Sequence, residues 1–325
     1  MPQHNPSSSD RLQALKSWLE RQGLPADHLR PASEDASFRR YFRLPDRDGE
    51  MRVVMDAPPD REPLDDFLEI DRRLRDAGLS APEILASDRQ QGFLLMEDFG
   101  DAHYLDVLDE QTAPALYGDA LKAIRVMQSR VPAADLPPYD ETLLRNEMAL
   151  FREWFVEGLL GLRLDARQEE DWNRTTDRLV QSALEQPRAF VHRDYHSRNL
   201  MRIPSRPGRP NPGILDFQDA VLGPVTYDLV SLLRDCYIAW PLDRVEAWLL
   251  EHYEQAKGEA LAGVDSRQFL TWFDRMGAQR HLKAIGIFAR LKLRDGKPGY
   301  LGDIPRTLGY LQQVAEGDDA LGGLR

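Results

Sequence analysis

The fold is decided by the stretch Val191-His192-Arg193-Asp194-Tyr195-His196-Ser197-Arg198-Asn199-Leu200, together with the stretch Ile214-Leu215-Asp216-Phe217-Gln218-Asp219. Asn199 follows Asp194 by five residues, and Asp216 follows Asn199 by seventeen. Apolar residues around both stretches predict short strands at 189–191 and 213–217. Each acid alone would most simply be a turn residue or a helix cap. Together they place a carboxylate, an amide and a second carboxylate at adjacent ends of short strands.

This set of side chains has the chemistry that phosphoryl transfer requires. In such a reaction the protein supplies mainly positioning and charge neutralisation. One carboxylate can orient and deprotonate an attacking hydroxyl, while an asparagine and a second carboxylate can hold Mg²⁺ against nucleotide phosphates. The spacing therefore indicates a phosphotransferase that uses a metal-bound nucleotide.

The composition of the chain excludes several classes of protein. Its 325 residues carry 42 Lys and Arg against 54 Asp and Glu, a formal net charge of −12, and 42% are hydrophobic, which excludes a disordered or fibrous chain. An acidic chain without a Lys/Arg run predicts no nucleic-acid partner. No apolar run reaches the roughly 20 residues of a membrane helix, and the N-terminus lacks a secretory signal, so we expect a cytoplasmic protein with no membrane partner. The single cysteine, Cys236, agrees with a reducing compartment.

Length and apolar pattern together predict two lobes. The segments 38–44 and 51–55 flank a turn and predict a β-hairpin, and helical spacing follows at 67–78. The first hundred residues are thus expected to form a few strands with a helix among them. Most of the remaining chain is expected to be helical, in the segments 114–129, 141–162, 166–185, 226–239, 243–260 and 267–294. The Pro-rich insert 202–212 is predicted to be a hairpin loop between the strands 189–191 and 213–217.

At these residues the sequence resembles the aminoglycoside phosphotransferase-like branch of the protein-kinase-like fold. His192-Arg193-Asp194 through Asn199 matches the catalytic loop of that family, and Leu215-Asp216-Phe217 matches the segment equivalent to the kinase Asp-Phe-Gly. The resemblance implies an α+β, bilobal fold with a small, strand-rich, nucleotide-covering N-terminal lobe at 1–98. A larger, mostly helical C-terminal lobe at 99–325 would carry the catalytic loop and the metal and sugar sites. It also implies ATP as donor, Asp194 as catalytic base, and Asn199 and Asp216 as Mg²⁺ ligands.

The resemblance further implies a nucleotide site and a substrate class. The backbone of Glu97 and Phe99, where that family joins its lobes, would bind the adenine edge. Within the family, the runs 37–43, 53–59, 192–201 and 215–220 are similar to those of bacterial amino-sugar kinases of cell-wall recycling. This similarity implies transfer to the anomeric hydroxyl of N-acetylmuramate or N-acetylglucosamine. An aminoglycoside or other small-molecule phosphotransferase, or a nucleotide-binding pseudokinase, stays open as an alternative.

One departure from the kinase pattern concerns the cation that meets the nucleotide phosphates. Kinases carry Val-Ala-Ile-Lys on the third strand, but the corresponding run here ends at Met55-Asp56 without a base. Arg39 or Arg40 could supply the charge instead, or both could lie on a solvated edge. The preceding loop has no glycine; it could hold phosphates through backbone N–H groups and the Ser37 hydroxyl, or be a plain acidic turn.

Several neighbours are candidates for the acceptor pocket. Sugars are commonly held by carboxylates and amides over an aromatic face, and the candidate residues are Tyr195, His196, Asp219 and Arg234, with Asp235 next to it. Simpler interpretations are that Tyr195 packs within the loop, that His196 is a loop hydrogen-bonder, and that Arg234 forms a surface ion pair with Asp235. Asp228 is expected to satisfy backbone donors of the catalytic loop. The sequence does not determine the oligomeric state.

Overall fold

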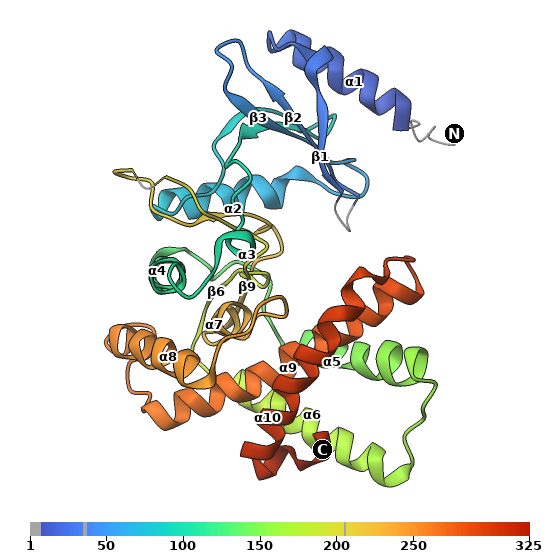
Figure 1. Ribbon diagram of the computed structural model, residues 1–325, viewed down its shortest axis with the longest axis vertical. Coiled ribbons are helices and arrows are strands. Elements are labelled where there is room, and N and C mark those ends of the chain that lie inside the picture. The colour runs from blue at the N-terminus through green and yellow to red at the C-terminus, as the bar shows by residue number, and fades with distance from the viewer. Residues whose placement is uncertain (1–7, 35–37, 205) are drawn as a thin grey trace.

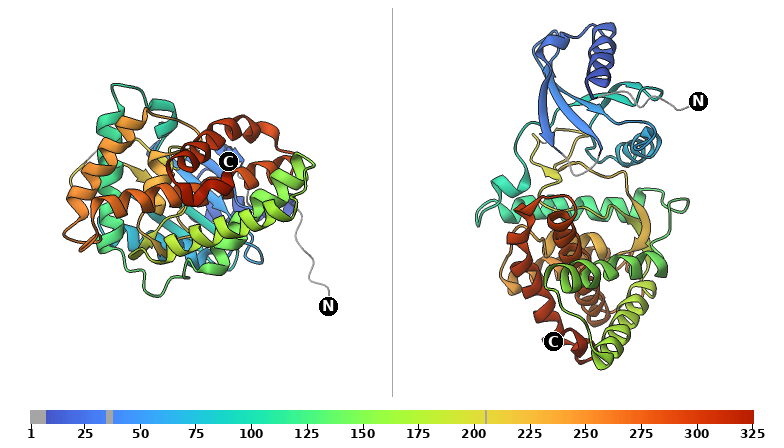
Figure 2. Two further views of the ribbon diagram at one scale, coloured as in Figure 1. Left: turned by 90° about the horizontal axis from the view of Figure 1, so that it is seen from below. Right: turned by 90° about the vertical axis from the view of Figure 1, so that its right-hand side faces the viewer.

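The computed structural model describes residues 8–34, 38–204 and 206–325. Figure 1 shows a smaller part that holds β1, β2, β3, α1 and α2, and a larger, mostly helical part below it. The right-hand view of Figure 2 shows the same division after a quarter turn. The predicted α+β architecture, with a strand-rich N-terminal lobe and a helical C-terminal lobe, is confirmed.

Within the described ranges, the smaller lobe is built on an antiparallel five-stranded sheet with the strand order β1-β2-β3-β5-β4. Its strands are β1 (Arg30–Glu34), β2 (Arg40–Pro45), β3 (Met51–Asp56), β4 (Ile84–Asp88) and β5 (Phe93–Glu97). The predicted hairpin is formed by β2 and β3, with Arg40 opposite Asp56 and Tyr41 opposite Met55. Strand β4 was not predicted, because its residues are at least partly exposed and its apolar run, Ile84-Leu85-Ala86, is only three residues long.

Different helices cover the two faces of this sheet. Since side chains alternate between faces along a strand, Val54 and Met55 of β3 point to opposite sides. Helix α1 (Ser8–Arg21) packs in the hydrophobic cluster that contains Val54, and α2 (Leu64–Asp76) packs in the cluster that contains Met55. The second cluster continues into the helical lobe, so α2 connects the cores of the two lobes.

The larger lobe is assembled around one long helix, α9. Its helices are α3 (Tyr104–Val107), α4 (Ala113–Arg130), α5 (Glu141–Leu150), the π-helix η2 (Phe151–Leu159), α6 (Ala166–Leu184), α7 (Tyr227–Leu233), α8 (Leu242–Ala256), α9 (Ser266–Leu293) and α10 (Ile304–Gly317). Gly286 lets α9 approach the end of α5, because a Cβ there would lie 2.3 Å from the carbonyl carbon of Leu150. None of the helices in the described ranges combines the length and the apolar character needed to cross a bilayer.

Two short antiparallel pairs position the motif residues. Strand β6 (Arg188–Val191) pairs with β9 (Val221–Pro224), and β7 (Leu200–Met201) pairs with β8 (Gly213–Ile214). The insert is therefore a hairpin loop, but the prediction that it joins 189–191 to 213–217 was wrong. The partner of the later strand is the two-residue β7, which is too short to produce a periodic pattern. The predicted helix at 226–239 is also shorter, since α7 ends at Leu233.

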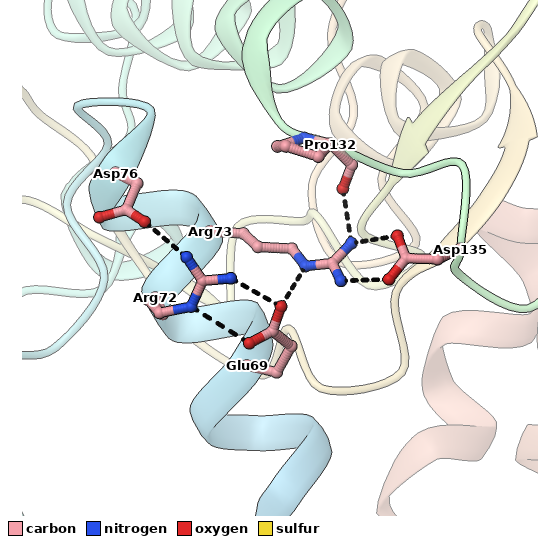
Figure 3. Close-up of polar contacts among 6 residues, drawn as sticks. All are labelled: Glu69, Arg72, Arg73, Asp76, Pro132 and Asp135. Carbon is pink, nitrogen blue, oxygen red and sulfur yellow. Dashed lines mark hydrogen bonds and ion pairs between the residues drawn. The ribbon is translucent and has the colours of Figure 1, made fainter.

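Polar contacts of Arg73 join α2 to the helical lobe (Figure 3). The buried Arg73 donates to both carboxylate oxygens of Asp135, at 2.8 and 2.6 Å, and to the carbonyl of Pro132 at 2.8 Å. On its own helix, Arg73 also donates to Glu69 at 2.8 Å. Both acceptors beyond the helix lie in the segment that follows α4, so this contact joins the lobes.

Candidate active site

Asp194 follows β6 in a turn that contains a left-handed residue and that is stabilised by hydrogen bonds to Asp228. Arg193 has φ +77°, a conformation that costs a non-glycine residue about 1–2 kcal/mol. Asp228, in the first turn of α7, accepts hydrogen bonds from the backbone N–H groups of His192 at 2.7 Å and Arg193 at 3.0 Å. The predicted role of Asp228 is thus confirmed. Burial raises the pKa of this carboxyl to about 7, and the two donated hydrogen bonds favour its ionised form.

The side chain of Asp194 lies in a positive environment. Burial alone would raise the pKa of Asp194, but nearby cationic groups, Lys283 first and Arg280 among them, outweigh burial and hold that pKa below its ordinary value. Lys283 and Arg280 both come from α9. The carboxylate therefore stays ionised at neutral pH, as a proton acceptor must.

A buried charge cluster beneath the turn keeps this environment in place. Glu147 of α5 accepts from Arg193 at 2.7 Å and pairs with Lys283 at 3.1 Å. The hydroxyl of Tyr139 also donates to Glu147, and Lys283 donates to the Tyr227 hydroxyl at 3.0 Å. Burial alone would lower the pKa of Lys283, but Tyr227, Glu147 and Asp194 raise it. The Lys283 ammonium group is therefore charged, and its charge helps to keep Asp194 ionised.

Asn199 and Asp216 lie together, as the sequence predicted. The amide nitrogen of Asn199 donates to the backbone carbonyl of Asp194 at 2.9 Å and to Asp216 Oδ2 at 3.3 Å. Asp216 has φ +61°, and its Oδ1 accepts from Gln218 at 2.9 Å. Within the described part of the chain, no three His, Cys, Asp or Glu side chains group into a metal site. The pair still fits Mg²⁺, which commonly takes one or two protein oxygens and completes its shell with water and phosphate oxygens.

A cavity of about 570 Å³ lies between the sheet and this loop. Its lining includes the four predicted residues Glu97, Phe99, Asn199 and Asp216. The other lining residues are Ala32, Tyr41, Arg43, Val53, Phe67, Pro82, Met96, Asp98, Gly100, Asp101, His103, Leu105, Asp106, Arg198, Met201, Leu215 and Phe217. The apolar part of the lining suits a flat ring. The polar part contains Asn199 and Asp216, the pair with oxygen atoms suited to Mg²⁺.

The segment after β5 presents backbone groups at one end of the cavity. In the described ranges, the N–H of Phe99 has no hydrogen-bond partner, whereas the N–H of Glu97 donates to Glu83 at 2.9 Å. The Glu97 carboxylate pairs with Arg209 of the insert, whose guanidinium also lies 5.3 Å from the Phe99 ring centre. The insert therefore covers this segment from outside.

The two candidate cations differ in position. Arg39 lies 2.8 Å from Glu62 and 4.0 Å from Asp216, so its charge is beside the pair of Asn199 and Asp216. Arg40 pairs with the buried Asp56, which also binds Arg11 of α1. Of the two, only Arg39 is next to the motif residues. The other nucleotide candidate, Ser37, falls outside the described residues.

The acceptor candidates separate in the same way. Tyr195 is fully buried, and its hydroxyl donates to the carbonyl of Ala120 at 3.1 Å, so it packs in the core and does not line the cavity. Arg234 donates to Asp274 at 2.6 Å and lies over Phe273, again away from the cavity lining.

Asp219 is exposed beyond Asp216, with Gln218 donating to it at 3.3 Å. His196 stays next to Asp194, and its buried Nδ1 has no partner among the described residues. Burial lowers the pKa of His196, so its ring is neutral at pH 7.

Sequence reasoning missed residues whose partners are distant in the chain. Asp235, predicted as half of a surface ion pair, is fully buried and accepts from the backbone N–H groups of Ser197 and Tyr237, both at 2.8 Å. Glu147 and Lys283 carry no local signal, because each looks like one more charge on a helix. Arg198 was not predicted as a cavity residue. Its position next to Asn199 in the catalytic-loop motif was the available sequence signal.

The fold is similar to that of two solved proteins, a choline kinase and an aminoglycoside phosphotransferase. Choline kinase LicA from Streptococcus pneumoniae superposes with a TM-score of 0.63 at 14% identity, over 93% of this chain and 98% of that one. The ADP-bound aminoglycoside phosphotransferase APH(2'')-Ib gives 0.61 at 14% identity, over 95% and 99%. At these identities the likeness establishes the protein-kinase-like fold, as predicted.

Sequence comparison then defines the family. Residues 28–270 match the profile of the Phosphotransferase enzyme family, and the chain belongs to this family. The N-acetylmuramate/N-acetylglucosamine kinase of Pseudomonas putida is 45% identical over 97% of this chain and 93% of its own length. The protein of the same name from Pseudomonas aeruginosa is 46% identical over 94% and 92%. The resemblance stated from the motifs is confirmed, and the chain is a phosphotransferase enzyme.

Proposed function

We propose that this protein is an ATP-dependent kinase that phosphorylates the anomeric hydroxyl of N-acetylmuramate or N-acetylglucosamine. The observation that carries the proposal is the meeting of Asp194, Asn199 and Asp216 beside a cavity where the backbone N–H of Phe99 has no partner among the described residues. Relatives named for this activity, at 45% and 46% identity along nearly the whole chain, support the choice of acceptor. We also propose a cytoplasmic location, where ATP is available.

The proposed chemistry assigns one proton and one phosphoryl group. Asp194 orients the sugar hydroxyl and takes its proton as the oxygen attacks the γ-phosphorus. The bond from that phosphorus to its bridging oxygen breaks, and ADP leaves. An anomeric hydroxyl is more acidic than an ordinary alcohol, so an ionised carboxylate is a sufficient base. A neutral His196 beside it can bind a second sugar hydroxyl.

We propose that the other end of the cavity binds the nucleotide. We propose that the Phe99 N–H and the Glu97 carbonyl bind the adenine edge. Asn199 and Asp216 would hold Mg²⁺, which when bound neutralises the phosphate charge. Arg39 beside Asp216 would replace the lysine that is missing at Met55.

The test is turnover by purified variants with N-acetylmuramate, N-acetylglucosamine and kanamycin as acceptors. Phosphorus NMR would locate the product phosphate on C1 of the amino sugars. The variant Asp194→Asn should lose about 10²–10⁴-fold in kcat and keep ATP affinity, whereas Asp216→Ala should lose Mg²⁺-dependent ATP affinity. Wild-type turnover of kanamycin alone would favour the aminoglycoside alternative, and turnover of no acceptor would favour the pseudokinase. Undiminished turnover by Asp194→Asn would show that another group is the base.

A further inference from the structure

Arg198 is a cavity-lining arginine without an ionic partner in the part of the chain that the structure describes. The other lining arginine, Arg43, pairs with Asp98 and Asp101. Among the described residues, the guanidinium of Arg198 forms no ion pair and no hydrogen bond, and the residue is exposed. It therefore keeps a full positive charge and five N–H donors that the protein does not use.

Aromatic rings hold this guanidinium in place. Its central carbon lies 3.7 Å from the ring centre of Tyr237 and 5.6 Å from that of Tyr300. Such contacts fix a cation electrostatically through the ring faces, and they leave its N–H groups available to a ligand. A salt bridge to a carboxylate would have consumed those donors instead.

The backbone of Arg198 is fixed from both sides as well. Its carbonyl oxygen is 2.9 Å from Nδ1 of His103. The preceding N–H, of Ser197, donates to the same Asp235 carboxylate that accepts from the Tyr237 N–H. The buried carboxylate of Asp235 thus fixes the backbone next to Arg198 and the backbone of Tyr237 relative to each other. A binding group held in this way is preorganised.

The guanidinium lies on the acceptor side of the site. Tyr237 follows α7 and Tyr300 lies in η3 (Pro298–Asp303), so both rings belong to the helical lobe. The ring of His196 contacts Tyr237 edge to face at 5.2 Å, and the backbone N–H of His196 donates to the carbonyl of Asp194 at 3.0 Å. Arg198 therefore reaches the side of the loop where the proposed base lies. In the proposed function the phosphates lie elsewhere, beside Arg39 and Asp216.

From these contacts we propose that Arg198 is the subsite for a carboxylate on the acceptor sugar. This inference rests on the proposed function and deepens it. Of the two proposed acceptors, N-acetylmuramate carries a lactyl carboxylate and N-acetylglucosamine does not. The cavity is lined by the five carboxylates Glu97, Asp98, Asp101, Asp106 and Asp216; Arg209 pairs with Glu97 and Arg43 with Asp98 and Asp101, and the lining still carries an excess of negative charge that would repel an anionic acceptor. A guanidinium with its donors free offsets that repulsion and offers a fork that matches a carboxylate.

The experiment compares the two sugars and one modified sugar in the full-length protein. The variant Arg198→Met keeps an apolar stem against the rings and removes the charge. Its kcat/KM for N-acetylmuramate should fall about tenfold to 150-fold, the range for hydrogen bonds to a charged group, and its kcat/KM for N-acetylglucosamine should change by less than about threefold. The methyl ester of N-acetylmuramate should lose the same factor with the wild type, and the variant should not distinguish the ester from the acid. Arg163→Met is the matched control, since Arg163 is exposed, has no described ion pair and does not line the cavity.

The possible results separate cleanly. Loss of N-acetylmuramate turnover alone, with the ester and the variant non-additive, supports the subsite. An equal loss for both sugars, or a rise only in the KM for ATP, would overturn it and assign the guanidinium to the phosphates. The N-acetylglucosamine rate of the variant reports whether it is folded, and Arg198→Lys adds a second variant that keeps the charge without the fork. If the wild type phosphorylates neither sugar, the proposed function fails and not only the subsite.

Discussion

Arg39 offers the sharpest test of how this kinase manages without a lysine at Met55. The variant Arg39→Gln removes the guanidinium that lies 4.0 Å from Asp216 and 2.8 Å from Glu62. Burial alone would lower the pKa of Arg39, but Tyr41 and Glu62 raise it, so the charge is present at every working pH. If that charge serves the nucleotide, ATP binding and transfer should suffer together.

The size of the effect follows from the distances. Two unit charges 4 Å apart interact by about 4 kcal/mol at an effective dielectric constant of about 20. Part of the charge of Arg39 is already balanced by Glu62, so the net loss should approach the range of about 1.5–3 kcal/mol for hydrogen bonds to charged groups. That range corresponds to a fall of about tenfold to 150-fold in kcat/KM for ATP.

The adjacent Arg40 supplies the control. Its partner Asp56 keeps Arg11 when Arg40 is replaced, so Arg40→Gln should change kcat/KM for ATP by less than about threefold. Both variants would be assayed by coupled ADP release at saturating sugar, with ATP affinity measured by calorimetry in Mg²⁺. A larger ATP defect in Arg40→Gln than in Arg39→Gln would refute the assignment.

Three further outcomes are expected. Lys283→Met should raise the pKa of Asp194, and because the base works ionised, the low-pH limb of the kcat/KM profile should move to higher pH; an unmoved limb would remove Lys283 from the site. Arg73→Ala and Asp135→Ala should each destabilise the protein in urea, and the double variant should show a coupling of about 1 kcal/mol or more; strict additivity would mean that the contact in Figure 3 does not fasten the lobes. Asp228→Asn should cost about 1.5–3 kcal/mol of stability, because an amide can accept from only one of the two backbone N–H groups, and an unchanged melting temperature would contradict that geometry.

The parts of the site that the sequence predicts are those whose chemistry is local. Asp194 and Asn199 are linked by a hydrogen bond that spans five residues, so their spacing and their geometry carry the same information. The hairpin of β2 and β3 is likewise local, and its turn residues predicted it. Such features survive in the pattern because short chain connections leave few alternative arrangements.

The parts that the sequence does not predict depend on contacts between remote segments. Tyr195 was a substrate candidate from its place in the loop, but its direction is set by Ala120, 75 residues earlier. Arg39 and Arg40 were equivalent until register placed Arg40 opposite Asp56. One residue of slip in a strand exchanges its two faces, and no periodicity in two residues can settle which faces the cavity.

The charges of the cavity lining explain why the proposed nucleotide and an anionic sugar would each need a specific cation to bind. The described lining carries five carboxylates against two guanidiniums, and Arg43 is already neutralised by Asp98 and Asp101. A triphosphate is repelled by such a wall unless a divalent ion and a cation such as Arg39 meet it at Asp216. An anionic sugar is repelled in the same way, which leaves Arg198 as the described lining group able to offset its charge. We therefore expect the acidic lining to discourage anions that lack the correct geometry, and we propose that Arg39 and Arg198 select the anions that bind.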